Sequence, residues 1–156
     1  MKQFIALFII ILFNSCKKEE MTLYTATLKN NTTHQITIYP YKNGVVNSSD
    51  TINLPPNMEF EIADGYFRGI VTGPGFGSNY FGGPNDSIVV YFDSQFRMTH
   101  YADQPQNVAS NFYPFTSTRN LGNPLSYTFQ SVSESNHRQR NMHLYTFVEQ
   151  DYLDAQ

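Results

Sequence analysis

Few side chains in this sequence are of the types that carry out covalent or metal chemistry. The chain of 156 residues contains one cysteine and four histidines. The histidines, His34, His100, His137 and His143, fall in separate predicted elements. None belongs to the His-Glu-x-x-His pattern that places two zinc ligands on one helical face. The sequence therefore predicts ordinary surface histidines and no metal site built from them.

The acidic residues also lack a recognisable metal or catalytic pattern. The aspartates of the predicted loops do not alternate and close on a glutamate, as an EF-hand loop requires. A calcium site assembled from loop carboxylates and carbonyls is the alternative that this leaves open. Glu59 and Glu61 are two residues apart and share one strand face, whereas a glycosidase needs two carboxyl groups across a cleft.

The glycine-rich stretch at residues 73–77 is no phosphate-binding loop. It reads Gly-Pro-Gly-Phe-Gly and lacks the Lys-Ser/Thr end and the following helix that hold a phosphate. No Gly-x-Ser-x-Gly nucleophile elbow occurs in the chain. We predict a protein that is not an enzyme and that has no cofactor, with a hydrolase as the minor alternative.

Cys16 is the one chemistry-bearing residue whose surroundings are specific. It follows an unbroken apolar run at residues 4–13, a basic residue at Lys2 and a small residue at Ser15. A bilayer-spanning helix needs about 20 apolar residues. A run of ten has the length of a signal-peptide core instead. Without a second cysteine, disulfides and thiolate metal sites are excluded.

This start resembles that of bacterial lipoproteins, in which a small residue precedes a cysteine that is acylated and becomes the mature N-terminus. The resemblance implies a cleaved signal peptide at 1–15, lipidation of Cys16 and a lipidated tether at 16–21. Lys17-Lys18-Glu19-Glu20 is similar to the acidic signals that follow this cysteine in surface lipoproteins of the Bacteroidota. The implied location is the outer membrane, with the protein held by acyl chains and facing the cell exterior.

Composition agrees with an extracytoplasmic β domain and argues against a nucleic-acid partner. Removal of residues 1–15 takes away one lysine and no acidic residue, which changes the formal net charge from −3 to −4. Nucleic-acid binding requires a basic surface. Charged residues make up only 15% of the chain, whereas phenylalanine and tyrosine number 13 and 11. Aromatic residues are enriched in strands.

Alternation of apolar and polar residues predicts about eight strands. They lie at 23–29, 34–39, 51–54, 58–62, 87–92, 96–101, 125–130 and 143–148. Asn43-Gly44 is the strongest hairpin signal, and Pro40 is expected at a strand end or edge. Residues 102–121 read as a long loop, residues 134–141 as a charged and polar stretch, and the tail from 149 as a single helical turn.

These elements predict an all-β fold. Without a helix long enough for a βαβ crossover, we expect an antiparallel β-sandwich, immunoglobulin-like in the broad sense, as a single domain over residues 22–156. A small β-barrel is the alternative. The strand at 87–92 is the most apolar of the mature chain and is expected to be central.

Residues 64–85 are predicted to form a loop rich in glycine and aromatic residues. Its aromatic rings offer flat faces for a sugar or a peptide, and an arginine among them offers a hydrogen-bonding fork. The candidate ligand-binding residues are Tyr66, Phe67, Arg68, Phe76, Tyr80 and Phe81. The alternative is that the rings cap the core and the glycines make tight turns.

Two tripeptides resemble the O-glycosylation signal of exported Bacteroidota proteins. They are Asp50-Thr51-Ile52 and Asp86-Ser87-Ile88, which would make Thr51 and Ser87 the acceptors. Both can equally be junctions between a turn and a strand.

The sequence as a whole favours a membrane-anchored protein with a non-enzymatic binding or interaction role at the cell envelope. Its broad likeness is to small Bacteroidota lipoproteins. The expected partners are the lipid bilayer, through Cys16, and a glycan or an envelope protein. A glycan-binding accessory protein that uses residues 64–85 is the main alternative.

Overall fold

The computed structural model describes residues 21–68, 86–103, 111–135 and 138–156, apart from the side chains of residues 63 and 66–68. Ten strands are present in this part of the chain, where the sequence predicted about eight. The strands are β1 (Met21–Asn30), β2 (Ile36–Lys42), β3 (Val45–Val46), β4 (Ile52–Leu54), β5 (Glu59–Arg68), β6 (Ser87–Phe92), β7 (Phe96–Tyr101), β8 (Phe112–Tyr113), β9 (Thr128–Ser135) and β10 (Arg138–Phe147). The helical elements are the 3-10 turns η1 (Ser48–Asp50) and η3 (Pro124–Ser126) and the helix α2 (Glu149–Ala155).

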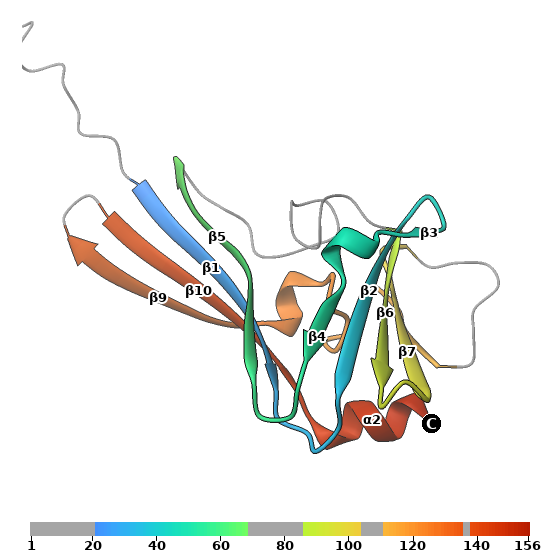
Figure 1. Ribbon diagram of the computed structural model, residues 1–156. Helices are drawn as coiled ribbons and strands as arrows, with labels where there is room; N and C mark the ends of the chain where they lie inside the picture. The colour runs from blue at the N-terminus through green and yellow to red at the C-terminus, as the bar shows by residue number, and fades with distance from the viewer. Residues whose placement is uncertain (1–20, 69–85, 104–110, 136–137) are drawn as a thin grey trace, which may run out of the picture.

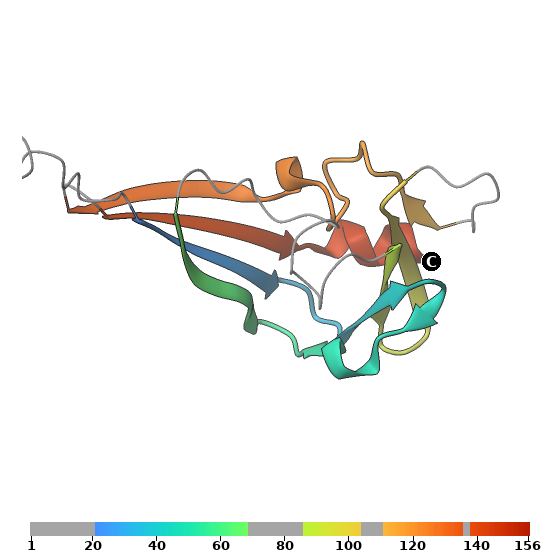
Figure 2. The same ribbon diagram turned by 90° about the horizontal axis from the view of Figure 1, so that it is seen from above.

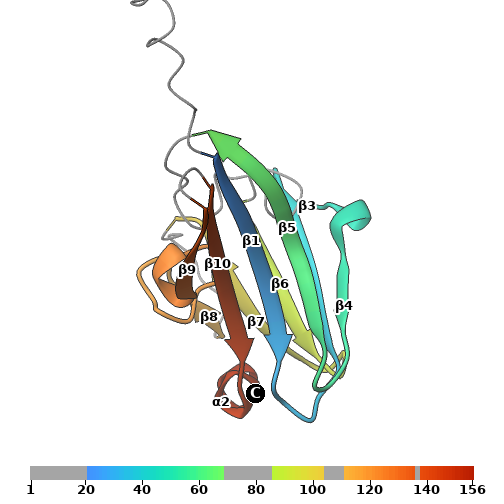
Figure 3. The same cartoon turned by 90° about the vertical axis from the view of Figure 1, so that its left-hand side faces the viewer.

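The strands form two sheets, which confirms the all-β prediction (Figure 1). The first sheet has the order β5-β1-β10-β9. The second has the order β3-β2-β6-β7-β8, and β4 also pairs with β2. Figure 3 shows the first sheet in front of the second. Both strand orders are open, so the described strands do not close into the small barrel considered as an alternative.

The prediction of purely antiparallel pairing is wrong for two pairs. β1 runs parallel to β10 in a continuous register from Met21 opposite Arg138 to Asn30 opposite Phe147. β7 runs parallel to β8. Short hairpins enforce antiparallel pairing, but the chain between β1 and β10 is long enough to bring its last strand back in either direction. Local sequence patterns carry no information on that choice.

The buried core contains residues from both sheets. Tyr24, Ala26 and Leu28 of β1 alternate with less buried residues and belong to one apolar cluster with Ile36 and Ile38 of β2. The cluster continues through β6, with Ile88, Val90 and Phe92, and through β10, with Tyr145 and Phe147. As the sequence predicted, β6 lies inside its sheet between β2 and β7.

Helix α2 covers one end of the core. In Figure 1 it lies at the bottom, beside the turns that join β1 to β2 and β6 to β7. Tyr152 packs edge-on against Phe92 and Phe96, with ring centroids 5.9 and 5.6 Å apart. The tail is therefore a packed seven-residue helix, longer than the single turn expected.

The hairpin of β9 and β10 extends away from the core (Figure 2). All eight residues of β9 are exposed, and they include Phe129 and Val132. The sequence placed this strand at 125–130 and did not predict its extension to Ser135, because its outer half has no apolar alternation to mark it. Backbone pairing with β10 stabilises this part of the strand, since its exposed side chains add no buried contacts.

Strand β5 is also longer than predicted, and this corrects the expected loop. Residues 64–68 continue the strand and pair with Met21 to Thr25 of β1, so the predicted loop at 64–85 is wrong for residues 64–68. A register shift between Ala26 and Thr27 leaves Ile62 of β5 without a direct partner in β1, as in a β-bulge. Gly65 lies opposite Tyr24, within the ladder, and so is no turn residue.

The predicted hairpin turn at Asn43-Gly44 is confirmed. Asn43 and Gly44 have φ angles of +52° and +72° and connect β2 to β3. Asp93 and Ser94, with φ angles of +51° and +60°, connect β6 to β7. The prediction that Pro40 lies at a strand end or edge is wrong, because Pro40 is buried within β2 and paired with Ile88. Its carbonyl accepts a hydrogen bond from Asn47 N at 2.8 Å.

Candidate ligand-binding site

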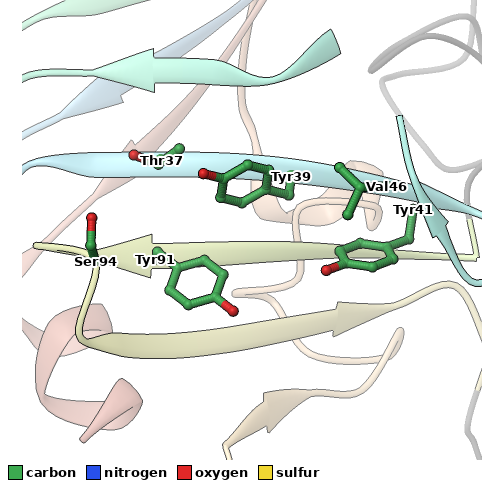
Figure 4. Close-up of a pocket in the computed structure, with 6 residues that line it drawn as sticks. All are labelled: Thr37, Tyr39, Tyr41, Val46, Tyr91 and Ser94. Carbon is green, nitrogen blue, oxygen red and sulfur yellow. The ribbon is translucent and has the colours of Figure 1, made fainter. Parts of the chain in front are cut away.

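The outer face of the second sheet carries a pocket lined by tyrosines. Ile36, Ile38 and Pro40 of β2 are buried and point into the core. Successive side chains of a strand point to opposite faces, so Thr37, Tyr39 and Tyr41 project from the outer face of the sheet. On β6 the same alternation places Tyr91 outward between buried Val90 and Phe92. Three aromatic rings therefore gather on one face of two neighbouring strands (Figure 4).

Strand register and two turns complete the pocket. Tyr91 lies directly opposite Thr37, which leaves Tyr39 diagonal to it, and the Tyr39 and Tyr91 rings meet edge-to-face at 5.6 Å and 88°. The Asn43-Gly44 turn folds Val46 back opposite Tyr41. Ser94, in the turn after β6, lines the other end of the pocket.

The pocket has a volume of about 320 Å³. Its six lining residues are Thr37, Tyr39, Tyr41, Val46, Tyr91 and Ser94. They present three phenols, two aliphatic hydroxyls and one apolar side chain, with no carboxylate, imidazole or amine among them. Such a lining offers aromatic faces and hydroxyl donors and acceptors, which suits reversible binding.

Two further polar residues lie beside the pocket on the same face. Asn53 of β4 is opposite Thr37, whose hydroxyl donates a hydrogen bond to Asn53 Oδ1 at 3.3 Å. Arg97 of β7 is opposite Tyr91 and is exposed. Arg97 is thus a cation on the same face as Tyr91, in the neighbouring strand.

A cluster around His34 joins the turn between β6 and β7, which borders the pocket, to helix α2. His34 Nδ1 lies 2.6 Å from Asp93 Oδ2, and Nε2 lies 3.0 Å from Glu149 Oε1. The imidazole also stacks on Tyr152 at 3.6 Å. The hydrogen bond to Asp93 raises the pKa of His34 and lowers the pKa of Asp93. Asp93 precedes Ser94, so the cluster holds the turn that bounds the pocket.

A second polar cluster is buried and structural. Arg119 donates from both Nε and Nη2 to Asp151, with an Nε to Oδ1 distance of 2.9 Å, and its guanidinium lies 4.8 Å from the centre of the Tyr145 ring. Asp151 Oδ2 also accepts from Val148 N at 2.8 Å and so caps the start of α2. This network connects the segment before η3 with the C-terminal helix.

The buried histidines do not form a metal site. His100 is fully buried and accepts a hydrogen bond from Leu121 N at 3.0 Å, and burial lowers its pKa to about 3. His143 belongs to the other sheet, where it stacks on Tyr24. Among the residues that the structure describes, no three His, Cys, Asp or Glu side chains are grouped as metal ligands. The prediction of surface histidines is wrong for these two residues.

The structure describes only the backbone of three of the ligand-binding residues predicted from the sequence. Tyr66, Phe67 and Arg68 belong to strand β5, and their side chains are outside the described part. Phe76, Tyr80 and Phe81 lie outside the described residues, as does Cys16. Residues 64–85 therefore remain a prediction as a binding region.

The two predicted O-glycosylation acceptors lie at starts of strands. Thr51 directly precedes β4, and Ser87 is the first residue of β6. Both side chains are partly exposed. Their positions match the alternative that each tripeptide is a junction between a turn and a strand.

Sequence reasoning missed the tyrosine pocket, although one signal for it was present. The inward placement of Ile36 and Ile38 implies that Thr37 and Tyr39 point outward. What the alternation does not contain is the pairing of β2 with β6, which brings Tyr91 to Tyr39 from 52 residues further along the chain. The high apolar content of 87–92 predicted a buried strand and did not indicate that Tyr91 lies on its outer face.

Comparisons of the chain with protein-family models, with curated proteins and with solved structures find no match. Within the described residues, none of the helices combines the length and the apolar character needed to cross a membrane.

Proposed function

We propose that this protein is a lipid-anchored envelope protein of the β-sandwich class, immunoglobulin-like in the broad sense, whose role is non-enzymatic binding. The observation that carries the binding role is the tyrosine pocket on the solvent face of the second sheet. Aromatic rings and hydroxyls exposed together on neighbouring strands inside a sheet are what a reversible binding site needs.

The anchor in this proposal is Cys16. Met21, the first residue of β1, is five positions after Cys16, so an extended tether spans at most about 17 Å. The start of β1, the last residues of β9 and the first residues of β10 lie at one end of the molecule, and α2 lies at the other (Figure 1). The anchored end would then be the end remote from α2, with the pocket on the side of the domain, open to its surroundings.

Lipid anchoring is tested by metabolic labelling with a fatty-acid precursor. The wild-type chain should take up label and remain in the outer-membrane fraction, whereas Cys16→Ala should do neither. Protease treatment of intact cells distinguishes the exterior face from the periplasmic face. Label on the Cys16→Ala protein would contradict the assignment.

The binding role is tested by photo-crosslinking in intact cells. A benzophenone amino acid in place of Val46, at the pocket, should give a defined adduct with an envelope component. The same group in place of Leu125, which is 81% exposed in η3, serves as the control and should give none. Equal adducts at both positions, or none at Val46, would contradict the role of the pocket.

A further inference from the structure

We infer that the tyrosine pocket binds an uncharged carbohydrate. This inference rests on the proposed binding role and names the class of ligand for the same pocket. It places the ligand on β2 and β6, not on the glycine-rich stretch that the sequence suggested.

The two rings of the Tyr39–Tyr91 pair offer a flat face and an edge. Their planes are 88° apart, so one planar ligand surface can lie parallel to only one of the two rings. The C–H face of a pyranose is weakly positive and packs on the negative face of an aromatic ring. The second tyrosine then presents its ring edge and hydroxyl to the substituents of the same sugar.

The hydroxyl groups of the pocket match a ligand that is itself rich in hydroxyls. Each phenol and each aliphatic hydroxyl can donate one hydrogen bond and accept others. Thr37 and Ser94 lie toward one end of the pocket and Tyr41 with Val46 lies at the other (Figure 4). Hydrogen-bonding groups therefore border the aromatic pair along the length of the pocket.

The pocket lining favours an uncharged ligand. None of the six lining residues carries a charge, and a charged ligand group that is removed from water needs an opposite charge beside it. Arg97 lies opposite Tyr91 on the same face but is not part of the lining. An acidic sugar in the pocket would find its opposite charge in Arg97, which makes Arg97 the residue that separates the two classes of ligand.

The backbone beneath the pocket disfavours an extended peptide. β2 is paired with β3 and β4 on one side and with β6 on the other, and β6 is paired with β7. Among the described strands, β2 and β6 each have neighbours on both sides, so neither is an edge strand to which a peptide could add. A proline-rich peptide could still dock on aromatic side chains, and it is the competing occupant in the test.

The experiment is a glycan array probed with the full chain in detergent, followed by calorimetry with the strongest uncharged oligosaccharide found. Tyr91→Ala and Tyr39→Ala should each weaken binding by at least about tenfold. Tyr91→Phe keeps the ring packing and should weaken it less than Tyr91→Ala. Phe129→Ala removes an exposed aromatic residue from the other sheet and should leave affinity unchanged. Thermal melts establish that each variant is folded.

Arg97→Gln decides between uncharged and acidic ligands. It should leave the affinity for the uncharged oligosaccharide unchanged. Preference for acidic glycans, lost in Arg97→Gln, would overturn the inference, as would absence of glycan binding or selective binding of a proline-rich peptide array. In these cases the Val46 photo-adduct still reports on the proposed binding role, so that failure of the ligand class and failure of that role are distinguishable.

Discussion

His34 Nδ1 lies 2.6 Å from Asp93 Oδ2, although 59 residues separate them in the chain. The contact joins the segment between β1 and β2 to the turn between β6 and β7. Asp93 Oδ1 also accepts a hydrogen bond from Gln35 N at 2.9 Å, so both oxygens of one carboxylate hold the same segment. Through Ser94, the next residue, this turn also borders the tyrosine pocket.

The His34–Asp93 pair should make stability depend on pH in a defined window. The folded-state pKa of His34 is raised above 6.5, so its contribution is complete below that pH and is lost as pH rises through the folded pKa. The folded-state pKa of Asp93 is lowered below 3.8, so its contribution is lost as pH falls through that lower value. The stabilising effect should therefore be largest between about pH 4 and 6.5.

The measurement is urea unfolding of the wild type and of His34→Phe from pH 3 to 9. His34→Phe retains a ring to stack on Tyr152 and removes the titrating group. The difference in free energy of unfolding should shrink as pH rises above the folded pKa of His34. In Asp93→Asn, which tolerates the same positive φ, NMR titration should show a lower pKa for His34. A difference that is constant with pH would contradict the linkage.

Asn30→Asp should be strongly destabilising at neutral pH. The fully buried Asn30 amide donates to the carbonyl oxygens of His34 at 2.8 Å and of Leu54 at 2.9 Å. An aspartate would place a buried carboxylate against two acceptors, at an expected cost of more than about 3 kcal/mol. The loss should be smaller near pH 3, where the carboxyl is neutral in the unfolded chain as well.

Asn31→Asp is the matched control for this prediction. Asn31 is the next residue and is exposed, so the same chemical change should alter the free energy of unfolding by less than about 0.5 kcal/mol. Equal losses for the two variants would show that the buried hydrogen bonds of Asn30 are not the cause.

Arg119→Ala should cost about 3–5 kcal/mol, because it removes the partner of a buried carboxylate. The Asp151 side chain is only 3% exposed and would keep the Val148 N–H as a donor, whereas the single proton of the Tyr113 hydroxyl is shared with Asp154. The double variant Arg119→Met with Asp151→Asn should lose less stability than Arg119→Ala, since no charge is then left unpaired. Arg97→Ala, at an exposed position, should leave the free energy of unfolding nearly unchanged. Denaturant unfolding measures this free energy for all three variants.

His143→Phe should stabilise the fold by about 1 kcal/mol at neutral pH. Both ring nitrogens of His143 are buried and have no hydrogen-bond partner among the residues that the structure describes, and the ring centroid lies 4.8 Å from that of Tyr24 and 4.9 Å from that of Phe129. Phenylalanine preserves the stacking and removes the unpaired polar atoms. Calorimetric melting of the two proteins gives the change directly.

The same substitution should flatten the acid side of the stability profile. Burial lowers the pKa of His143 in the folded state, so the unfolded chain binds the additional proton first as pH falls through about 6.5. The wild type therefore loses stability toward acid from this residue, and His143→Phe should not. A variant with an unchanged acid limb would contradict the assignment.

Much of the strand content could be predicted from local patterns. The apolar run at 87–92 and the pattern at 96–101 predicted the bounds of β6 and β7. Asn43-Gly44 marked its turn, because left-handed backbone angles favour such residues. Prediction failed where pairing with a distant strand supplied the order. The extension of β5 to Arg68 depends on pairing with β1, and the extension of β9 to Ser135 depends on pairing with β10. The residues of β5 and β9 alone contain no pattern that predicts these pairings.

The sequence by itself determined the β character of this protein and the chemistry available to it. A two-residue period, the Asn43-Gly44 turn and a single cysteine are local properties, so they are readable without coordinates. The tertiary structure decided the parallel pairing of β1 with β10 and the assembly of Tyr39 and Tyr91 on one face. It also decided the contacts of His34 with Asp93 and Glu149. Each depends on which distant strands become neighbours, and that is settled by burying the whole core at once.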